Sequence, residues 1–390
     1  MRRAFLVAVL AAALAVPPAP AQSRAATGAF VTRLGIDTIT VERYNRTAAR
    51  LEGEVLGRSP RTSLRRYVAD FSSTGSLARI QVTWHRVGAA ADSPPLRALT
   101  AVVGADSVRV ELRRGDTLQT SAVASAPGLL PTLAGAWAPL ELFTVRSSRV
   151  RRDSIAVPAY GLSGEGARAT TVVTLRPLGR DSLLVSSGTA RYRVRTDREG
   201  RIVGLQAPGT TQQVTVERVP RLDIAAVATA WAALDAQGQA MGILSPRDTV
   251  RATVAGASLL VDYGRPRRRG REIFGAVVPW GQVWRAGANA ATQLRTDREL
   301  IVGGLAVAAG TYTLWTVPTP SGWQLVINRQ TGQWGTVYDA AQDLGRAPMS
   351  VESLVEPVEV FTIAVEPQGQ GGVLSFAWDR TRASVPFTVR

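Results

Sequence analysis

The sequence contains no cysteine and no lysine, and His85 is its single histidine. Without cysteine the chain cannot form disulfides, thiolate metal sites or a lipid-modified cysteine, so its stability must come from packing and hydrogen bonds. A single histidine also excludes zinc sites built from several histidines. We therefore expect no metal site of these kinds and no cofactor.

Hydrolase signatures are equally sparse. A Ser-His-Asp triad would need His85 as its base, and GLSG at 161–164 lacks the second glycine of a nucleophile elbow. GEGARA at 164–169 has dinucleotide-like glycines, but a β-branched run follows it where a helix is needed. These absences favour a protein that is not an enzyme.

Paired carboxylates stay open as an alternative, because glycoside hydrolysis needs only two acidic side chains at a suitable separation. No motif demands any of the candidates, and the many arginines offer each of them an ion-pair partner. The candidates are Asp262, Glu272, Asp297, Glu299, Asp339, Asp343, Glu352 and Glu359.

All 46 basic side chains are arginine, and against 30 acidic residues they give a formal net charge of +16, or +14 without Arg2 and Arg3. The planar fork of arginine binds carboxylates and phosphates, so anionic glycans, lipid headgroups or nucleic acid would suit this charge. A GC-rich coding bias explains the arginine content as well. Nucleic acid is disfavoured because an exported protein meets few such targets.

The first residues are typical of a signal peptide. Arg2 and Arg3 precede an apolar run over 4–16, and Ala19-Pro20-Ala21 offers the small-x-small site that signal peptidase cuts. The run is too short to span a bilayer comfortably, and no later segment reaches about 18 uncharged apolar residues. We expect a cleavable signal peptide over 1–21 and a soluble mature chain in the periplasm or outside the cell.

The length of 390 residues predicts two domains. Alternating strand-length segments separated by polar turns predict an antiparallel, curved sheet over 22–222, with a short helix or loop over 128–143 that plugs one face. Apolar residues at helical spacing predict a connecting helix over 223–242, capped by Asp223.

About eight short strands predict a β-sandwich over 243–390, including separate strands at 358–365, 373–378 and 384–389. The expected fold class is therefore mainly β: an N-terminal antiparallel sheet, one connecting helix and a C-terminal β-sandwich.

Glycine, proline, tryptophan and arginine are dense over 262–296, which predicts a defined surface loop. Here YGRP at 263–266, GREIFG at 270–275, VPWGQVWR at 278–285 and GAN at 287–289 resemble the DUF2911 family in order and spacing. The resemblance continues at 309–314, 323–328, 333–335 and 378–387.

The resemblance implies a domain of unknown function, found mostly in bacterial proteins of which many carry export signals. In this family the GAN block is often followed by glutamate, whereas Ala290 stands here. This difference argues against a carboxylate-dependent role at that position.

The same region supplies candidate ligand-binding side chains. Tryptophan faces stack on sugars or aromatic groups, arginine clamps carboxylate or phosphate, and asparagine both donates and accepts hydrogen bonds. Core packing and the capping of buried carbonyls compete with this interpretation, and 267–269 is expected to be a solvated loop tip. The candidates are Arg265, Arg271, Trp280, Trp284, Arg285, Asn289 and Trp334.

The sequence thus predicts an exported protein that binds, without catalysis, an anionic or sugar-like small molecule, a glycan or an anionic envelope polymer. Two alternatives stay open: a hydrolase that uses paired carboxylates on glycans, and a structural or assembly protein of the cell envelope. Binding driven by charge alone should collapse at high ionic strength, whereas a tryptophan-lined pocket should keep its ligand.

Overall fold

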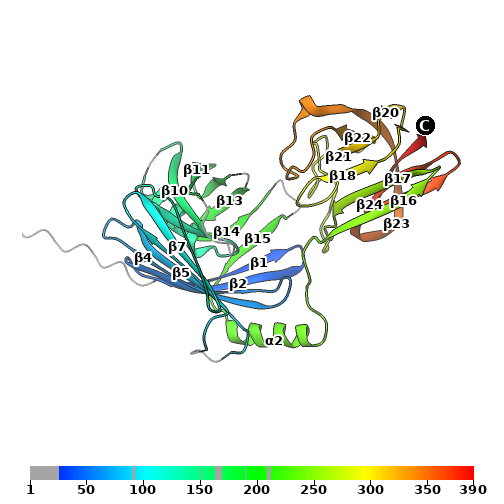
Figure 1. Ribbon diagram of the computed structural model, residues 1–390. Coiled ribbons are helices and arrows are strands. Elements are labelled where there is room, and N and C mark those ends of the chain that lie inside the picture. Colours follow the sequence, from blue (N-terminus) through cyan, green and yellow to red (C-terminus); the bar gives the residue numbers. More distant parts are fainter. Residues whose placement is uncertain (1–25, 90–92, 151, 163–168, 189, 209–211) are drawn as a thin grey trace, which may run out of the picture.

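The computed structural model describes residues 26–89, 93–150, 152–162, 169–188, 190–208 and 212–390 (Figure 1). The predicted signal peptide lies outside these residues, as do Ser163 and the glycines at 164 and 166. Strands dominate the described chain, which confirms the mainly β class. None of its helices in the described part is both long and apolar enough to cross a membrane.

The N-terminal sheet has 15 strands in the order β8-β7-β6-β5-β4-β3-β2-β1-β15-β14-β13-β12-β11-β10-β9. Neighbours are antiparallel except for β9 and β10, which are parallel. Its strands are β1 Ala26–Leu34, β2 Asp37–Arg46, β3 Arg50–Gly57, β4 Ser63–Phe71, β5 Leu77–His85, β6 Arg97–Val103, β7 Ser107–Arg114, β8 Thr117–Ala124, β9 Leu130–Leu133, β10 Ile155–Leu162, β11 Thr171–Pro177, β12 Ser182–Ser187, β13 Ala190–Thr196, β14 Ile202–Gln206 and β15 Val214–Val219.

Period-two alternation of apolar and charged residues produces these strands. In β7, Val108, Val110 and Leu112 are buried while the residues between them are exposed. Successive side chains of a strand point to opposite faces, so this pattern places one face on a core and the other in water. Gly115, with φ of 55°, allows the tight turn into β8.

Helix α1, Ala138–Ser148, follows β9 and packs on the inner face of this sheet. Trp137, Leu140 and Phe143 join the strand residues in one apolar core. The segment predicted as a plug therefore does cover one face of the sheet, with β9 as its first part.

Helix α2, Ile224–Ala236, lies on the other face, below β1 and β2 in Figure 1. Trp231 packs with Val41 and Leu56, whose side chains point away from the main core. Asp223 caps the helix as predicted, since its Oδ1 accepts from the amide of Ala226 at 3.0 Å.

The C-terminal sheet has nine strands in the order β16-β17-β18-β21-β22-β23-β24-β19-β20. A 3-10 turn, η1 Ala340–Gln342, precedes β23. The strands are β16 Arg247–Val254, β17 Ala257–Gly264, β18 Thr292–Thr296, β19 Leu300–Val302, β20 Leu305–Val307, β21 Gly310–Thr319, β22 Gly322–Asn328, β23 Asp343–Gln368 and β24 Gly371–Val389.

Strands β23 and β24 are much longer than predicted. The segments expected as separate strands at 373–378 and 384–389 are one strand, and β23 begins at Asp343 rather than near 358. Two register shifts between Ser353 and Thr362 interrupt the pairing of β23 with β24. Such irregularities bend a strand and allow a proline such as Pro357 within it. The hairpin has β22 as its neighbour on one side and β19 on the other, so it takes part in both layers of the sandwich.

The core between those layers is rich in aromatic residues. Phe361 of β23 and Trp378 of β24 pack with Val261 of β17 and Trp323 of β22 in one buried cluster. The predicted β-sandwich is therefore built from a single hydrogen-bonded sheet that folds onto itself.

Candidate functional site

A cavity of about 850 Å³ lies between one end of the N-terminal sheet and the loops of the C-terminal sandwich. Ligand sites commonly have this size and occur where two structural units meet. Its charged lining consists of arginine alone among the described residues: Arg65, Arg97, Arg191, Arg267, Arg269, Arg271 and Arg285.

Strands β4, β5 and β6 build the N-terminal wall. Arg65 lies on the same strand face as Tyr67 and Ala69, which are both fully buried, so its guanidinium points inward. The guanidinium carbon of Arg97 lies 3.8 Å from the centroid of the Trp84 ring, a cation–π distance. Burial lowers the pKa of Arg65, an effect that Glu42 opposes and Arg97 reinforces.

The loop before α1 and strand β13 add an aromatic part to this wall. The rings of Trp137 and Tyr192 meet edge to face with centroids 5.7 Å apart. The indole Nε1 of Trp137 donates to Thr32 Oγ1 at 2.8 Å, which fixes the ring against β1. An aromatic surface beside arginines suits a ligand that has both a ring and a negative charge.

Four of the seven predicted residues line the opposite wall: Arg271, Arg285, Asn289 and Trp334. Arg285 is 8% exposed and donates to the carbonyl of Gly335 at 3.2 Å. The amide of Gly335 donates in turn to the carbonyl of Asn289 at 2.9 Å. A Cβ at Gly335 would lie 1.9 Å from Arg285 Cδ, so glycine is needed for this close approach.

Two arginines of this wall, Arg271 and Arg285, are partly desolvated by burial. Burial lowers the pKa of Arg285 to about 10. Burial and the neighbouring Arg269 lower the pKa of Arg271 to about 10, although Glu359 acts in the opposite direction. Both remain cations at neutral pH, so a bound anion would gain from two poorly hydrated positive charges.

The other three predicted residues do not line the cavity. Arg265 donates to Asp248 Oδ2 at 2.8 Å and to Thr362 Oγ1 at 3.1 Å. Trp284 is 7% exposed and stacks on Trp378 with centroids 5.9 Å apart, inside the sandwich core. Trp280 is 41% exposed and lies against Phe274. Arg265 and Trp284 therefore contact other residues of the sandwich and stabilise its fold.

The expectation that 267–269 is a solvated loop tip is wrong for Arg268 and Arg269, whereas Arg267 is exposed. Arg269 is 6% exposed and forms an ion pair with Asp37 of β2, and Arg268 pairs with Asp379 at 2.8 Å. The amide of Ile36 also donates to the carbonyl of Arg269 at 3.1 Å. The loop therefore docks on the β1–β2 turn and joins the N-terminal sheet to the sandwich.

One comparison connects these loops to other proteins. Residues 245–387 match the DUF2911 family. That family is described as a protein of unknown function, and the match confirms the resemblance carried by the loop motifs. No curated protein matches the sequence.

Two solved structures resemble larger parts of the chain. A DUF1089-family protein of Pseudomonas aeruginosa is 12% identical, with a TM-score of 0.33, 45% of this chain covered and 92% of the other. A β-barrel-like protein with a DUF1849 domain from Brucella abortus is 9% identical, with a TM-score of 0.33, 50% of this chain covered and 94% of the other. Neither similarity transfers a function to this chain.

Several carboxylates of the DUF2911 region form ion pairs or hydrogen bonds outside the cavity. Asp262 pairs with Arg247 at 2.9 Å, Glu352 with Arg382 at 3.2 Å, and Glu299 with Arg390 at 3.3 Å. Asp343 accepts from Tyr338 at 2.6 Å. No three His, Asp or Glu side chains of the described residues gather as metal ligands.

Two buried carboxylates that sequence reasoning missed hold α1 in place near the cavity. Glu42 of β2 accepts the amide of Trp137 at 2.5 Å and the hydroxyl of Tyr67 at 2.6 Å. Its carboxylate thereby caps the start of α1, where backbone amides lack helical partners. Burial raises the pKa of Glu42 to about 7, and the nearby Glu141 adds to this shift.

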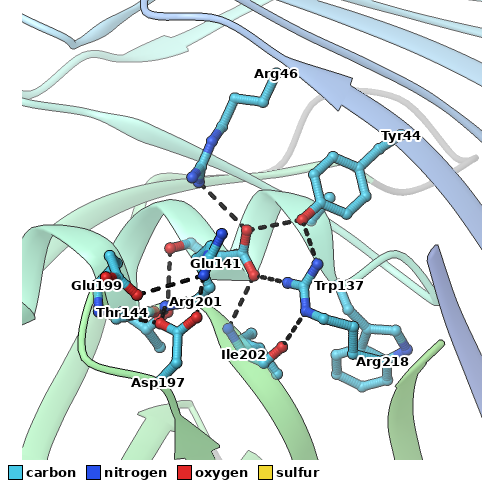
Figure 2. Close-up of polar contacts among 12 residues, drawn as sticks. Tyr44, Arg46, Trp137, Glu141, Thr144, Asp197, Glu199, Arg201, Ile202 and Arg218 are labelled. Carbon is cyan, nitrogen blue, oxygen red and sulfur yellow. Dashed lines mark hydrogen bonds and ion pairs between the residues drawn. The ribbon is translucent and has the colours of Figure 1, made fainter. Parts of the chain in front are cut away.

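Glu141, in the first turn of α1, is fully buried at the centre of a polar network (Figure 2). It accepts from Tyr44 at 2.8 Å and from the amide of Ile202 at 2.8 Å, and forms an ion pair with Arg218. Arg46 lies 3.4 Å away. This network attaches the plug helix to β2, β14 and β15.

A sequence signal for the N-terminal wall did exist. Arg65 and Arg97 occupy the positions in the strand alternation that their neighbours Tyr67 and Leu99 use for the core. A charged residue on the apolar face of a strand is expensive without a partner or a polar cavity. Inward-facing arginines near the ends of strands therefore indicate a site here, and this signal is present in the sequence.

Proposed function

We propose that the chain is a binding protein that holds an anionic, sugar-like or ring-bearing ligand in the cavity between the two sheets. The observation that carries the proposal is a lining that combines seven arginines with Trp84, Trp137, Tyr192 and Trp334, and includes no acidic residue among those described. Arginine supplies bidentate contacts to carboxylate or phosphate, and tryptophan supplies stacking surface.

The absence of carboxylates from the described lining favours binding over glycoside hydrolysis at this site, since that reaction needs two of them. Export through a cleavable signal peptide belongs to the same proposal and would bring the protein to glycans of the cell envelope. A polymer with a repeating anionic unit could present one unit to the cavity.

The first experiment is a calorimetric titration of the protein with trigalacturonic acid and, separately, with neutral maltotriose. We expect the acidic trisaccharide to bind and the neutral one not to bind. Binding should persist in 1 M NaCl, where the Debye length is about 3 Å, because the buried arginines are poorly screened.

Matched variants locate the binding. Arg65→Gln and Trp334→Ala should each weaken it about tenfold, corresponding to about 1.4 kcal/mol. Arg113→Gln, which removes an exposed charge on β7, should leave it unchanged. Equal binding of maltotriose would contradict the proposed site. Binding of the acidic trisaccharide that is lost in 1 M NaCl and unchanged by both cavity variants would contradict it as well.

A further inference from the structure

A second pocket, of about 590 Å³, lies at the opposite end of the N-terminal sheet. The cavity described above meets β2 at Ile39 and β4 at Ser63, near their starts, whereas this pocket meets Arg46 and Phe71 at their ends. Helix α1 stands between them, because Trp137 precedes it in the first cavity and Arg146 lies near its end in the second.

The floor of the second pocket is apolar. Leu130 of β9 is 2% exposed, and Phe71 and Leu142 are partly buried residues packed against the main core. Val145 of α1 completes the floor and is also only partly buried. The partly buried side chains of Phe71, Leu142 and Val145 thus present apolar surface to the pocket, and the core beneath them is closed.

The rim is cationic and rich in hydroxyl groups. Arg146 is held in place across the pocket wall, since it donates to the carbonyl of Gly128 at 2.9 Å and to that of Gly75 at 3.3 Å. Burial and the neighbouring Arg149 lower the pKa of Arg146. Arg46 is held by Glu141, and Ser72 and Thr74 supply hydroxyl groups from the β4–β5 turn.

The charge of the rim favours an anion. Arginine is the only charged residue type among the described residues that line this pocket. The end of α1 carries partial negative charge from its free carbonyls, and Arg146 and Arg149 exceed that charge. An oxyanion placed between them would relieve their mutual repulsion and could accept from nearby hydroxyl groups.

We propose that the second pocket binds a single-chain anionic amphiphile, with its oxyanion head on Arg146 and Arg149 and the start of its chain on Phe71, Leu142 and Val145. An apolar floor beside arginines fits a molecule that has both an apolar chain and an anionic head, and the volume lies in the range of small-molecule sites. This site shares no lining residue with the cavity of the proposed function.

The test is calorimetric titration of the protein with decanoate below its micelle concentration, with decyl maltoside and inorganic phosphate as separate probes. We expect decanoate to bind, and each of the other two to bind at least tenfold more weakly. Comparable binding of decyl maltoside would reduce the site to apolar adsorption, and comparable binding of phosphate would reduce it to a simple anion site; either result overturns the proposal.

Variants decide whether binding occurs at this pocket. Arg149→Gln changes an exposed side chain and should weaken decanoate binding about tenfold, and Val145→Asp, which places a carboxylate where the start of the apolar chain would lie, should do so more strongly. Arg65→Gln and Arg113→Gln should have no effect, and thermal unfolding checks that all variants fold. Loss of binding through Arg65→Gln, or none through Arg149→Gln, overturns the assignment.

Discussion

At the scale of single residues, the buried carboxyl group of Glu42 should make the stability of the protein depend on pH. Its carboxylate is completely buried, and burial raises its pKa from the ordinary 4.5 to about 7, although Tyr67 and the backbone amides of Trp137 and Ala138 at the start of α1 favour the charged form. The folded state therefore binds this proton more tightly than the unfolded state does, and stability is lost as the pH rises from about 4.5 to about 7.

We predict that the free energy of unfolding, measured by urea denaturation, is lower at pH 8 than at pH 5 by up to about 3 kcal/mol because of Glu42. Glu42→Gln should remove this decrease. The lowered pKa of His85 acts in the opposite direction in the same range, so the variant must be compared with the parent at each pH. Parallel pH profiles of the free energy of unfolding for variant and parent would contradict this prediction.

At the scale of elements, the loops of the DUF2911 region contain two kinds of tryptophan that the sequence does not distinguish. Trp284 contacts Phe274, Phe361 and Trp378 in the sandwich core, whereas Trp334 is 54% exposed at the cavity. Trp284 thus packs in the core of the fold, whereas Trp334 contributes surface to the cavity.

We expect Trp284→Ala to lower the free energy of unfolding by about 3–5 kcal/mol, because it leaves a cavity among aromatic rings. Trp334→Ala should change it by no more than about 0.5 kcal/mol. Urea denaturation of the two variants measures both values. Similar losses would mean that Trp334 also supports the fold and cannot serve as a clean probe of binding.

At the scale of the whole molecule, a few contacts connect the two sheets and shape the cavity between them. Arg269 reaches Asp37, and Gln213 Nε2 donates to the carbonyl of Ala276 at 3.1 Å. Gly35 permits this docking, since a Cβ there would lie 2.0 Å from the carbonyl oxygen of Arg269. The β1–β2 turn thus holds the loop that supplies Arg267, Arg269 and Arg271 to the cavity lining.

Asp37→Asn should weaken this connection, because it leaves the buried Arg269 without its carboxylate. We expect a loss of about 1–3 kcal/mol, since Asp37 is 31% exposed and partly screened, and faster hydrogen exchange of the Ile36 amide. Glu217→Gln, which breaks the exposed pair with Arg33, should cost less than about 1 kcal/mol. Unchanged exchange at Ile36 would show that the pair does not hold the two units together.

The sequence by itself determined the mainly β class, the α2 helix with its Asp223 cap and the DUF2911 resemblance. Period-two and helical patterns, and the chemistry of a helix cap, are local properties. It also picked out seven candidate residues in the DUF2911 region, of which Arg271, Arg285, Asn289 and Trp334 line one cavity. Signal peptide and export stay predictions of the sequence.

Only the tertiary structure decided which of those side chains face a cavity and which fill a core. Arg65 and Arg97 come together with Arg285 because strands far apart in the chain end beside the same loops, and no local pattern encodes that meeting. The lengths of β23 and β24 were also decided at this level, since their pairing is interrupted around Pro357 and resumes at Val358. Side-chain exposure depends on which partner segments pack against a strand, so it is fixed only when the two sheets are in place.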